Sequence, residues 1–199
     1  MHGRYIQILV ATAGFWFCTA PHAADSTSAG TTPTGFRVVQ LESGKCRTLQ
    51  PDGWVRRGGP APSGEALFIT AMPYTEDEAS FIGLDLQVQN KALKKPTTIS
   101  DDLTSLVYSE LHGEKLLGSD VIAFAAPSRT ASTLLYRYIV RQRFHSRPIV
   151  VYRTRLADET TASSIWVEFQ APEERWAEAW KLGRIMLDAL TCRGVNAKF

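Results

Sequence analysis

The sequence predicts an α+β domain: a mostly antiparallel sheet of about six to eight strands, with a mid-chain helix and a C-terminal amphipathic helix packed on it. Two observations support this fold class. Short runs rich in β-branched and aromatic residues follow one another without regular helical crossovers between them. In two places the hydrophobic period changes from two to nearly four, which is typical of an amphipathic helix.

Residues 1–24 have the layout of a secretory signal peptide. Arg4 and the amino terminus form a short positive region, the stretch 6–20 is almost free of charge, and small residues follow it. We expect export to the periplasm or secretion, with cleavage after Ala23 or Ala24. An uncleaved anchor is the alternative, but the apolar run is short against the ~20 residues that a bilayer span needs.

Cys18 offers lipid attachment as a further alternative. Bulky aromatic residues stand directly before it, whereas a lipid-attachment signal has small residues there. We therefore expect no integral membrane span in the mature chain.

The charge of the mature chain favours no particular partner. Removing residues 1–24 takes away one of the 22 basic residues and none of the 20 acidic ones, which leaves 21 against 20 and a formal charge of +1. A nucleic-acid partner needs a basic surplus, so none is expected. The hydrophobic share of 44% and the charged share of 21% are ordinary for a globular domain.

Residues 25–35 are rich in Ser, Thr, Gly and Pro and are predicted to be a flexible lead-in. Residues 36–199 then form a single α+β domain, whose first strand is expected at Phe36–Leu41. The stretch 57–64 holds three glycines and two prolines and is predicted to be an exposed loop.

Two further strands are predicted at 66–72 and 81–88, separated by an acidic cluster, Glu76–Glu78. This cluster is interpreted as a solvated loop tip, because a cation site would need regularly spaced oxygen ligands. A helix is expected from Ser100, as its cap, to about Gly113, and a short strand over 121–126.

A β-hairpin and a third strand form the centre of the predicted sheet. From Leu134 to Phe144, apolar residues recur at even positions while arginines stand at odd ones. After a connection of hairpin length, residues 149–156 are again rich in β-branched and aromatic side chains. Residues 164–169 supply the third strand.

The closing helix is predicted to begin after Pro172. Proline suits the first helical position, and Glu173 and Glu174 suit the positive end of the helix. Its apolar stripe consists of Trp176, Trp180, Gly183, Leu187 and Leu190. We interpret the two tryptophans as core packing against the sheet, since each can bury roughly 150–250 Å².

Cys46 and Cys192 are the cysteines that remain after residues 1–24 are removed. In an oxidising compartment an even pair favours a disulfide, which would tie the start of the domain to the end of the last helix. A redox-active cysteine and a metal ligand are the alternatives, but no CxxC pattern is present.

The order of these elements resembles the PsbP/DcrB-like superfamily over about Phe36 to Leu190. The residues that carry the resemblance are Pro51, Gly53 and Trp54 in a turn, Thr98–Leu103 at a helix start, and Trp176 and Trp180 in the last helix. That superfamily includes an extrinsic subunit of photosystem II, a Ran-binding nuclear protein, periplasmic proteins tied to envelope uptake and chaperones of type VI effectors. The resemblance implies an accessory or binding role without catalysis, and it transfers no ligand-binding residue.

No motif predicts an enzyme. The sequence has no Gly-x-Ser-x-Gly elbow, no Gly-rich phosphate loop and no His-Glu-x-x-His. The two histidines of the mature chain, His112 and His145, stand apart, so neither a histidine-based triad nor a zinc site is expected. We expect no catalytic residue, no metal and no cofactor.

The arginines of the central hairpin are the candidate binding residues. If the turn is centred near Ser146, odd positions pair with odd ones and five arginines share one face of the sheet. These are Arg137, Arg141, Arg143, Arg153 and Arg155. One interpretation is a solvated face paired with Glu168 or Asp158. The other is a docking surface for an acidic protein, a phosphate-bearing lipid or a glycan.

The sequence thus predicts a secreted or periplasmic, non-catalytic binding or accessory protein of the cell envelope, whose partner is another envelope or secreted protein. Two alternatives stay open. One is an immunity-type inhibitor that inserts the acidic loop Glu76–Glu78 into a toxin's active site, and the other is an unrecognised periplasmic hydrolase. A flat patch would favour the binding protein, and a pocket lined with polar groups would favour the hydrolase.

Overall fold

The computed structural model describes residues 32–61, 64–71, 82–90, 98–112, 120–144, 147–195 and 198–199. The predicted signal peptide, most of the predicted lead-in and the acidic cluster Glu76–Glu78 lie outside these residues.

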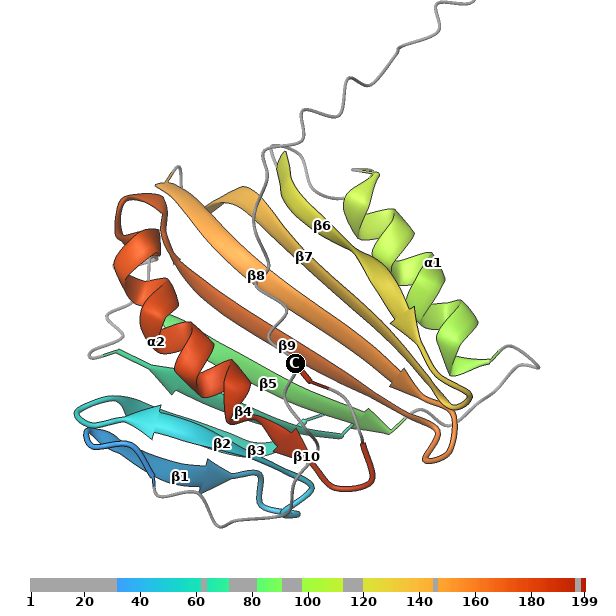
Figure 1. Cartoon of the computed structure of the whole chain (residues 1–199), viewed down its shortest axis with the longest axis horizontal. Coiled ribbons are helices and arrows are strands. Elements are labelled where there is room, and N and C mark those ends of the chain that lie inside the picture. The colour runs from blue at the N-terminus through green and yellow to red at the C-terminus, as the bar shows by residue number, and fades with distance from the viewer. Residues whose placement is uncertain are drawn as a thin grey trace, which may run out of the picture. The chain divides into compact units, whose positions relative to one another are not determined.

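The described strands form two antiparallel sheets (Figure 1). The large sheet has seven strands in the order β3 (Val55–Ala61), β4 (Gly64–Thr70), β5 (Gly83–Asn90), β9 (Ser163–Pro172), β8 (Arg147–Asp158), β7 (Thr133–Phe144) and β6 (Asp120–Arg129). The small sheet has three, in the order β1 (Phe36–Gln40), β2 (Cys46–Pro51) and β10 (Thr191–Cys192). With helices α1 (Ile99–Leu111) and α2 (Trp176–Asp188), this arrangement confirms the predicted α+β class.

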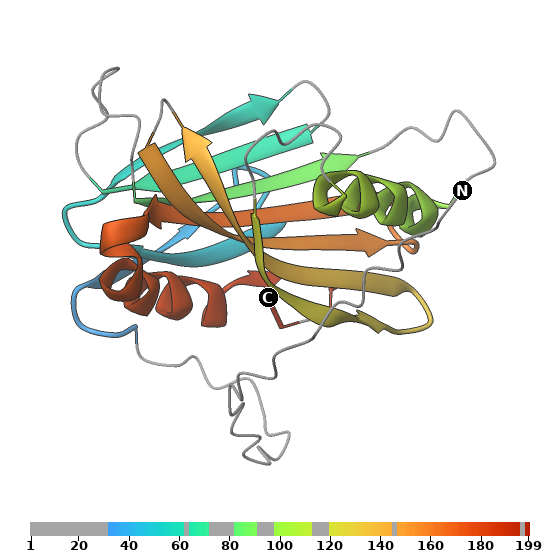
Figure 2. The same ribbon diagram turned by 90° about the horizontal axis from the view of Figure 1, so that it is seen from above.

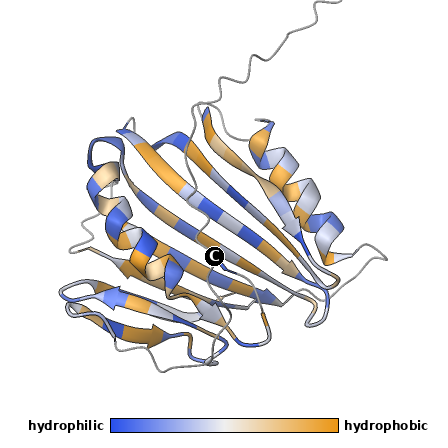
Figure 3. Cartoon of the chain, in the orientation of Figure 1, coloured by the Kyte–Doolittle hydropathy of each residue, from blue (hydrophilic) through white to orange (hydrophobic). Residues whose placement is uncertain are grey.

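The alternation in the sequence becomes the two faces of the large sheet. Hydrophobic and hydrophilic residues alternate along its strands (Figure 3). In β7 the even residues Leu134, Tyr136, Tyr138 and Val140 are buried in a core cluster with α1. In β9 the odd residues, among them Phe169, belong to a second cluster with α2. The two helices therefore cover opposite faces of the large sheet, as Figure 2 shows from above.

The prediction of a loop over residues 57–64 is wrong. Residues up to Ala61 belong to β3 and those from Gly64 to β4, and Pro60 pairs with Glu65. A proline and glycines fit here because β3 is an edge strand, where a missing N–H on the outer side breaks no ladder bond.

The N-cap of helix α1 lies two residues before the predicted one. The side chain of Thr98 accepts a hydrogen bond from the Asp101 N–H at 3.1 Å, so Thr98 is the N-cap. Ser100 is buried inside the helix, and its N–H donates to Glu159 Oε1 at 2.8 Å. Ile99, Leu103 and Val107 are the buried apolar residues of α1.

Helix α2 begins later than predicted, since a 3₁₀ turn at Glu173–Arg175 separates it from Pro172. Trp176 and Trp180 stack at 5.1 Å between ring centroids and pack on Phe169, so they pack against the core of the sheet as predicted, although both stay half-buried. The other side of α2 meets the small sheet, where the Thr48 hydroxyl donates to the Met186 carbonyl at 2.6 Å.

Cys46 and Cys192 form a disulfide, as predicted. They lie directly opposite each other in the pairing of β2 with β10. The bond therefore fastens the segment after α2 to the small sheet.

Candidate functional site

The register of the β7–β8 hairpin decides how the predicted arginine face is built. Phe144 pairs with Arg147 and Tyr138 with Arg153, so even residues of β7 lie opposite odd residues of β8. The prediction of one face with five arginines is therefore wrong. The strands are connected by two residues, 145 and 146, so the pairing is not centred on Ser146. This changes the register by one residue, and such a change moves all side chains of one strand to the other face relative to its partner.

Three of the candidates stay together on the α2 side of β7. Arg137, Arg141 and Arg143 all have odd numbers in β7 and therefore lie on the same face of the sheet. We call them the arginine row. Arg141 pairs with Glu173 at 2.5 Å and lies 4.0 Å from Asp120. Its side chain is 44% exposed.

The other two members of the row have no carboxylate within 4.0 Å among the residues that the structure describes. Arg137 is half-buried and donates to the backbone carbonyl of Lys198. Arg143 is exposed.

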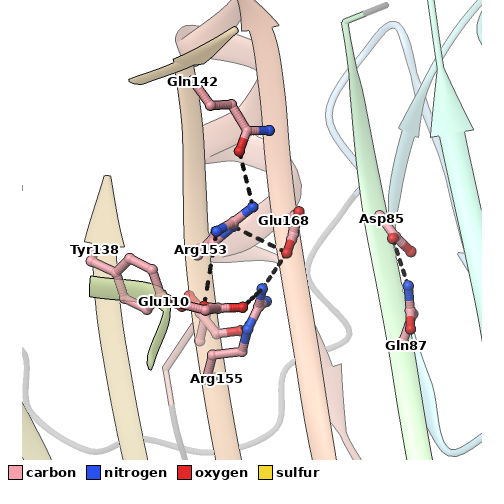
Figure 4. Close-up of polar contacts among 9 residues, drawn as sticks. Asp85, Gln87, Glu110, Tyr138, Gln142, Arg153, Arg155 and Glu168 are labelled. Atoms are coloured by element: carbon pink, nitrogen blue, oxygen red, sulfur yellow. Dashed lines mark hydrogen bonds and ion pairs between the residues drawn. The ribbon is translucent and has the colours of Figure 1, made fainter. Parts of the chain in front are cut away.

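The remaining two candidates, Arg153 and Arg155, lie on the opposite face beneath α1. They form a buried ion cluster with Glu110 of α1 and Glu168 of β9 (Figure 4). Arg153 Nε is 3.2 Å from Glu168 Oε1, and Arg155 Nη2 is 3.4 Å from Glu110 Oε1. Arg155 also contacts Glu168 directly, and only 1% of it is exposed.

Further contacts hold this cluster in place. The Tyr138 hydroxyl donates to Glu110, and Arg153 donates to the Gln142 side chain at 3.3 Å. The Arg155 guanidinium lies 4.9 Å above the centre of the Trp166 ring system. Burial opposes ionisation of Glu168, but the charges of Arg155 and Arg153 outweigh it and lower the pKa of this carboxyl.

The buried ion cluster neutralises itself, because two guanidinium groups face two carboxylates. Arg153 and Arg155 are thus occupied and are not open to an anionic partner. The sequence predicts Glu168 as a possible partner of the arginines, whereas no sequence prediction names Glu110. The available signal was its spacing, since Glu110 stands three residues after Val107 and therefore falls on the apolar stripe of α1.

Asp85 adjoins the cluster on β5. It accepts a hydrogen bond from the Gln87 side chain at 2.8 Å through Oδ2, while its buried Oδ1 has no hydrogen-bond partner. Burial raises the pKa of Asp85 to about 6, and the charge of Glu168 adds to this, against the opposing effects of Gln87 and Arg155. No sequence motif marks this residue.

In the described part of the chain, no three His, Cys, Asp or Glu side chains come together as metal ligands. A cavity of about 80 Å³ lies between residues 40–42 and strands β3 and β4, well below the ~300 Å³ at which ligand pockets begin. Neither described helix is long and apolar enough to cross a membrane.

No family model matches the chain, and no curated protein matches it. Solved structures do. LpqN of Mycobacterium tuberculosis, described as involved in cell envelope biogenesis, is 9% identical over 73% of this chain and 82% of its own, with a TM-score of 0.50. The chain has the PsbP-like fold.

Two further structures with the PsbP-like fold cover most of the chain. Cyanobacterial PsbP (CyanoP) of Synechocystis is 12% identical over 84% of this chain and 98% of its own, with a TM-score of 0.49. The Ran-binding protein Mog1p of Saccharomyces cerevisiae is 9% identical over 79% and 95%, also at 0.49. Identities this low establish the fold alone, so function has to be argued from the residues of this chain.

Proposed function

We propose that this protein is a non-catalytic binding protein of the cell envelope, exported to the periplasm or secreted, which holds an acidic envelope or secreted protein on its arginine row. The arginine row itself carries the proposal. It presents three guanidinium groups on one strand, and Arg141 alone has carboxylates near it among the described residues. Guanidinium groups bind carboxylates with two parallel hydrogen bonds, so an acidic surface suits them.

The compartment rests on two separate features. Residues 1–24 have the order of charge, apolar run and small residues that export requires. The Cys46–Cys192 disulfide fits an oxidising compartment. Mass spectrometry of the protein from a periplasmic or secreted fraction is expected to find a chain that begins at Ala24 or Asp25. An intact Met1 or a lipid on Cys18 would contradict export with cleavage.

The site offers little to a hydrolase. The Glu and Arg side chains of the buried ion cluster are engaged with one another. The acidic loop on which an immunity-type inhibitor would depend lies outside the described residues.

The test is affinity capture from envelope extract with Arg141→Ser/Arg143→Ser as the variant. Both residues are exposed, so we expect the free energy of unfolding to change by no more than about 1 kcal/mol. Capture should nonetheless fall, and wild-type capture should weaken with added salt, because exposed charges are screened over ~8 Å at physiological ionic strength.

Arg37→Ser/Arg56→Ser is the matched control. Both arginines are exposed, and they lie on β1 and β3, away from β7. This variant removes the same charge and should leave capture unchanged. Equal capture by wild type and by the Arg141/Arg143 variant at every salt concentration would reject the arginine row as a binding surface.

A further inference from the structure

Strand β6, next to the arginine row, is a free edge of the large sheet. Within the described part of the chain it pairs with β7 alone, and all ten of its residues are exposed. Its centre, 121–126, carries no charge. Three of its large apolar side chains lie in the open: Val121 is 45% exposed, Ile122 48% and Phe124 45%.

The opposite edge of the same sheet is built differently. Strand β3 carries Arg56, Arg57 and Pro60, which are the residues that natural proteins use to prevent a foreign strand from pairing. In β6 the charges stand only at the ends, Asp120 and Arg129. Pro127 lies within an irregularity of the β6–β7 pairing rather than in a regular ladder position. The centre of β6 thus has neither a charge nor a proline, although its pairing with β7 is irregular between Val121 and Ala123 and between Ala125 and Ser128.

The register gives the two faces of β6 different characters. Val121 and Phe124 lie opposite Val140 and Tyr138, on the α1 side, and the Phe124 ring is 6.4 Å from that of Tyr138. On the α2 side, Ala123 and Ala125 lie opposite Ile139 and Arg137, while Ile122 lies at an irregularity of the pairing. The two alanines leave room beside the arginine row, and Arg141 already lies 4.0 Å from Asp120 of β6.

We propose that β6 binds its partner by strand addition, and that the segment it takes up alternates apolar and acidic residues. This inference rests on the proposed function and names the surface and the partner's chemistry. The added strand would hydrogen-bond to the free backbone edge of β6. Its apolar side chains would meet Val121 and Phe124, and its carboxylates would meet the arginine row across the small residues of β6.

Charge favours such a partner over a second copy of this chain. A two-fold pairing of β6 with β6 keeps equivalent faces on the same side of the joined sheet. The arginine rows of both copies would then lie on one face, with the two β6 strands between them. Asp120 of one copy would lie near Arg129 of the other in such a pairing, but only an acidic segment offers carboxylates to the arginine row itself.

The experiment uses the whole protein and a fluorescent ten-residue peptide in which Glu alternates with Val. A peptide with Lys in place of every Glu is its control. We expect the Glu peptide to bind at least about tenfold more tightly in fluorescence anisotropy, which corresponds to a few cross-strand pairs. Hydrogen exchange should slow at the amides of 121–126.

Val121→Asn/Ile122→Asn removes two apolar β-branched side chains from this edge without adding charge, and it should weaken binding of the Glu peptide at least about tenfold. Val38→Asn is the control, since Val38 is a 55% exposed valine on β1 of the other sheet. It should leave binding unchanged.

Equal affinity for the Glu and Lys peptides, unaltered binding by the β6 variant, or exchange protection confined to other strands would each overturn strand addition. Elution of the free protein as a dimer that the β6 variant abolishes would replace the acidic partner by a second copy. If peptide binding depends on β6 while capture from envelope extract ignores Arg141 and Arg143, the proposed function fails and strand addition survives. If capture depends on Arg141 and Arg143 while peptide binding ignores the β6 variant, strand addition fails and the proposed function survives.

Discussion

Asp85 of β5 lies directly opposite Glu168 of β9 in the antiparallel pairing of the large sheet. Residues so placed have Cβ atoms about 5 Å apart, so two ionised carboxylates would repel each other there. Arg155 and Arg153 keep Glu168 ionised, and burial together with that negative charge favours the protonated form of Asp85. The pair therefore divides into one ionised and one readily protonated carboxyl.

The first prediction is that Asp85→Asn stabilises the protein at neutral pH. The pKa of Asp85 in the fold, about 6, lies above its ordinary value of 3.8, so the native state retains this proton at pH values where the unfolded chain has lost it. Stability is consequently lost as pH rises from about 4 to 6, and the loss persists above 6. Asn cannot ionise, and it should raise the free energy of unfolding by about 1–3 kcal/mol at pH 7.5.

Urea unfolding at pH 7.5 and at pH 3.5 measures this effect. At pH 3.5 the Asn variant and the wild type should be nearly equal, because Asp85 is mostly protonated in both the folded and the unfolded state. The exposed Asp52 supplies the control substitution, Asp52→Asn. A destabilised Asp85→Asn protein at pH 7.5 would mean that the ionised carboxylate is needed.

The second prediction contrasts a buried with an exposed ion pair. Glu168→Gln leaves Arg153 and Arg155 with Glu110 as their remaining carboxylate, and breaking a buried pair costs about 3–5 kcal/mol. Glu173→Gln removes the partner of Arg141 on the surface and should cost no more than about 1 kcal/mol. Chemical denaturation of both variants at pH 7 provides the comparison.

The pH dependence gives an independent check on Glu168. Its pKa is lowered from an ordinary value of 4.5, so its contribution to stability is present above 4.5 and is lost as pH falls through the lower value in the fold. Glu168→Gln should therefore approach the wild type in stability at acid pH. A constant difference between the two at all pH values would show that the loss comes from packing and not from charge.

The sequence alone was enough for the fold class, the central strands, the stripe of α2 and the disulfide, because each depends on a local pattern or on a count. It was not enough for the hairpin register. Alternation fixes which residues of β7 share a face, but β8 has apolar residues of both parities, such as Val150 and Val151, so the pattern does not align the strands. A connection of two residues reverses the parity assumed for a turn centred on Ser146.

The buried ion cluster could not be predicted for a related reason. Glu110 meets Arg155 only because α1 packs across β8, and nothing in the local sequence records which strand a helix covers. Strand β3 was missed because its glycines and proline are also typical of loops, and only its place at a sheet edge makes them compatible with a strand.

The third prediction concerns Gly183, where α2 packs tightly against Phe169 of the large sheet. A Cβ atom there would stand 2.7 Å from the Phe169 ring. Alanine favours a helix over glycine by about 1 kcal/mol, but overpacking a rigid aromatic core costs about 1–3 kcal/mol. Gly183→Ala should therefore lower the melting temperature. Gly59→Ala, which meets open space, should not, and Gly183→Ala/Phe169→Leu should recover part of the loss.

The last prediction is that the Cys46–Cys192 bond forms in the exported protein and stabilises it. The bond joins residues 146 positions apart, so it removes much conformational freedom from the unfolded chain, and loss of such a native bond costs about 2–5 kcal/mol. The protein unfolded without reductant should give no reaction with a thiol reagent, and its mass should be two hydrogens below that of the reduced chain.

Cys46→Ser/Cys192→Ser should unfold at lower denaturant concentration. Dithiothreitol should destabilise the wild type to the same extent, because it reduces the Cys46–Cys192 bond. It should leave the double variant unchanged, because that variant has no cysteine after residues 1–24 are removed. Free thiols in the unreduced protein, or equal stability of the two chains, would contradict the bond.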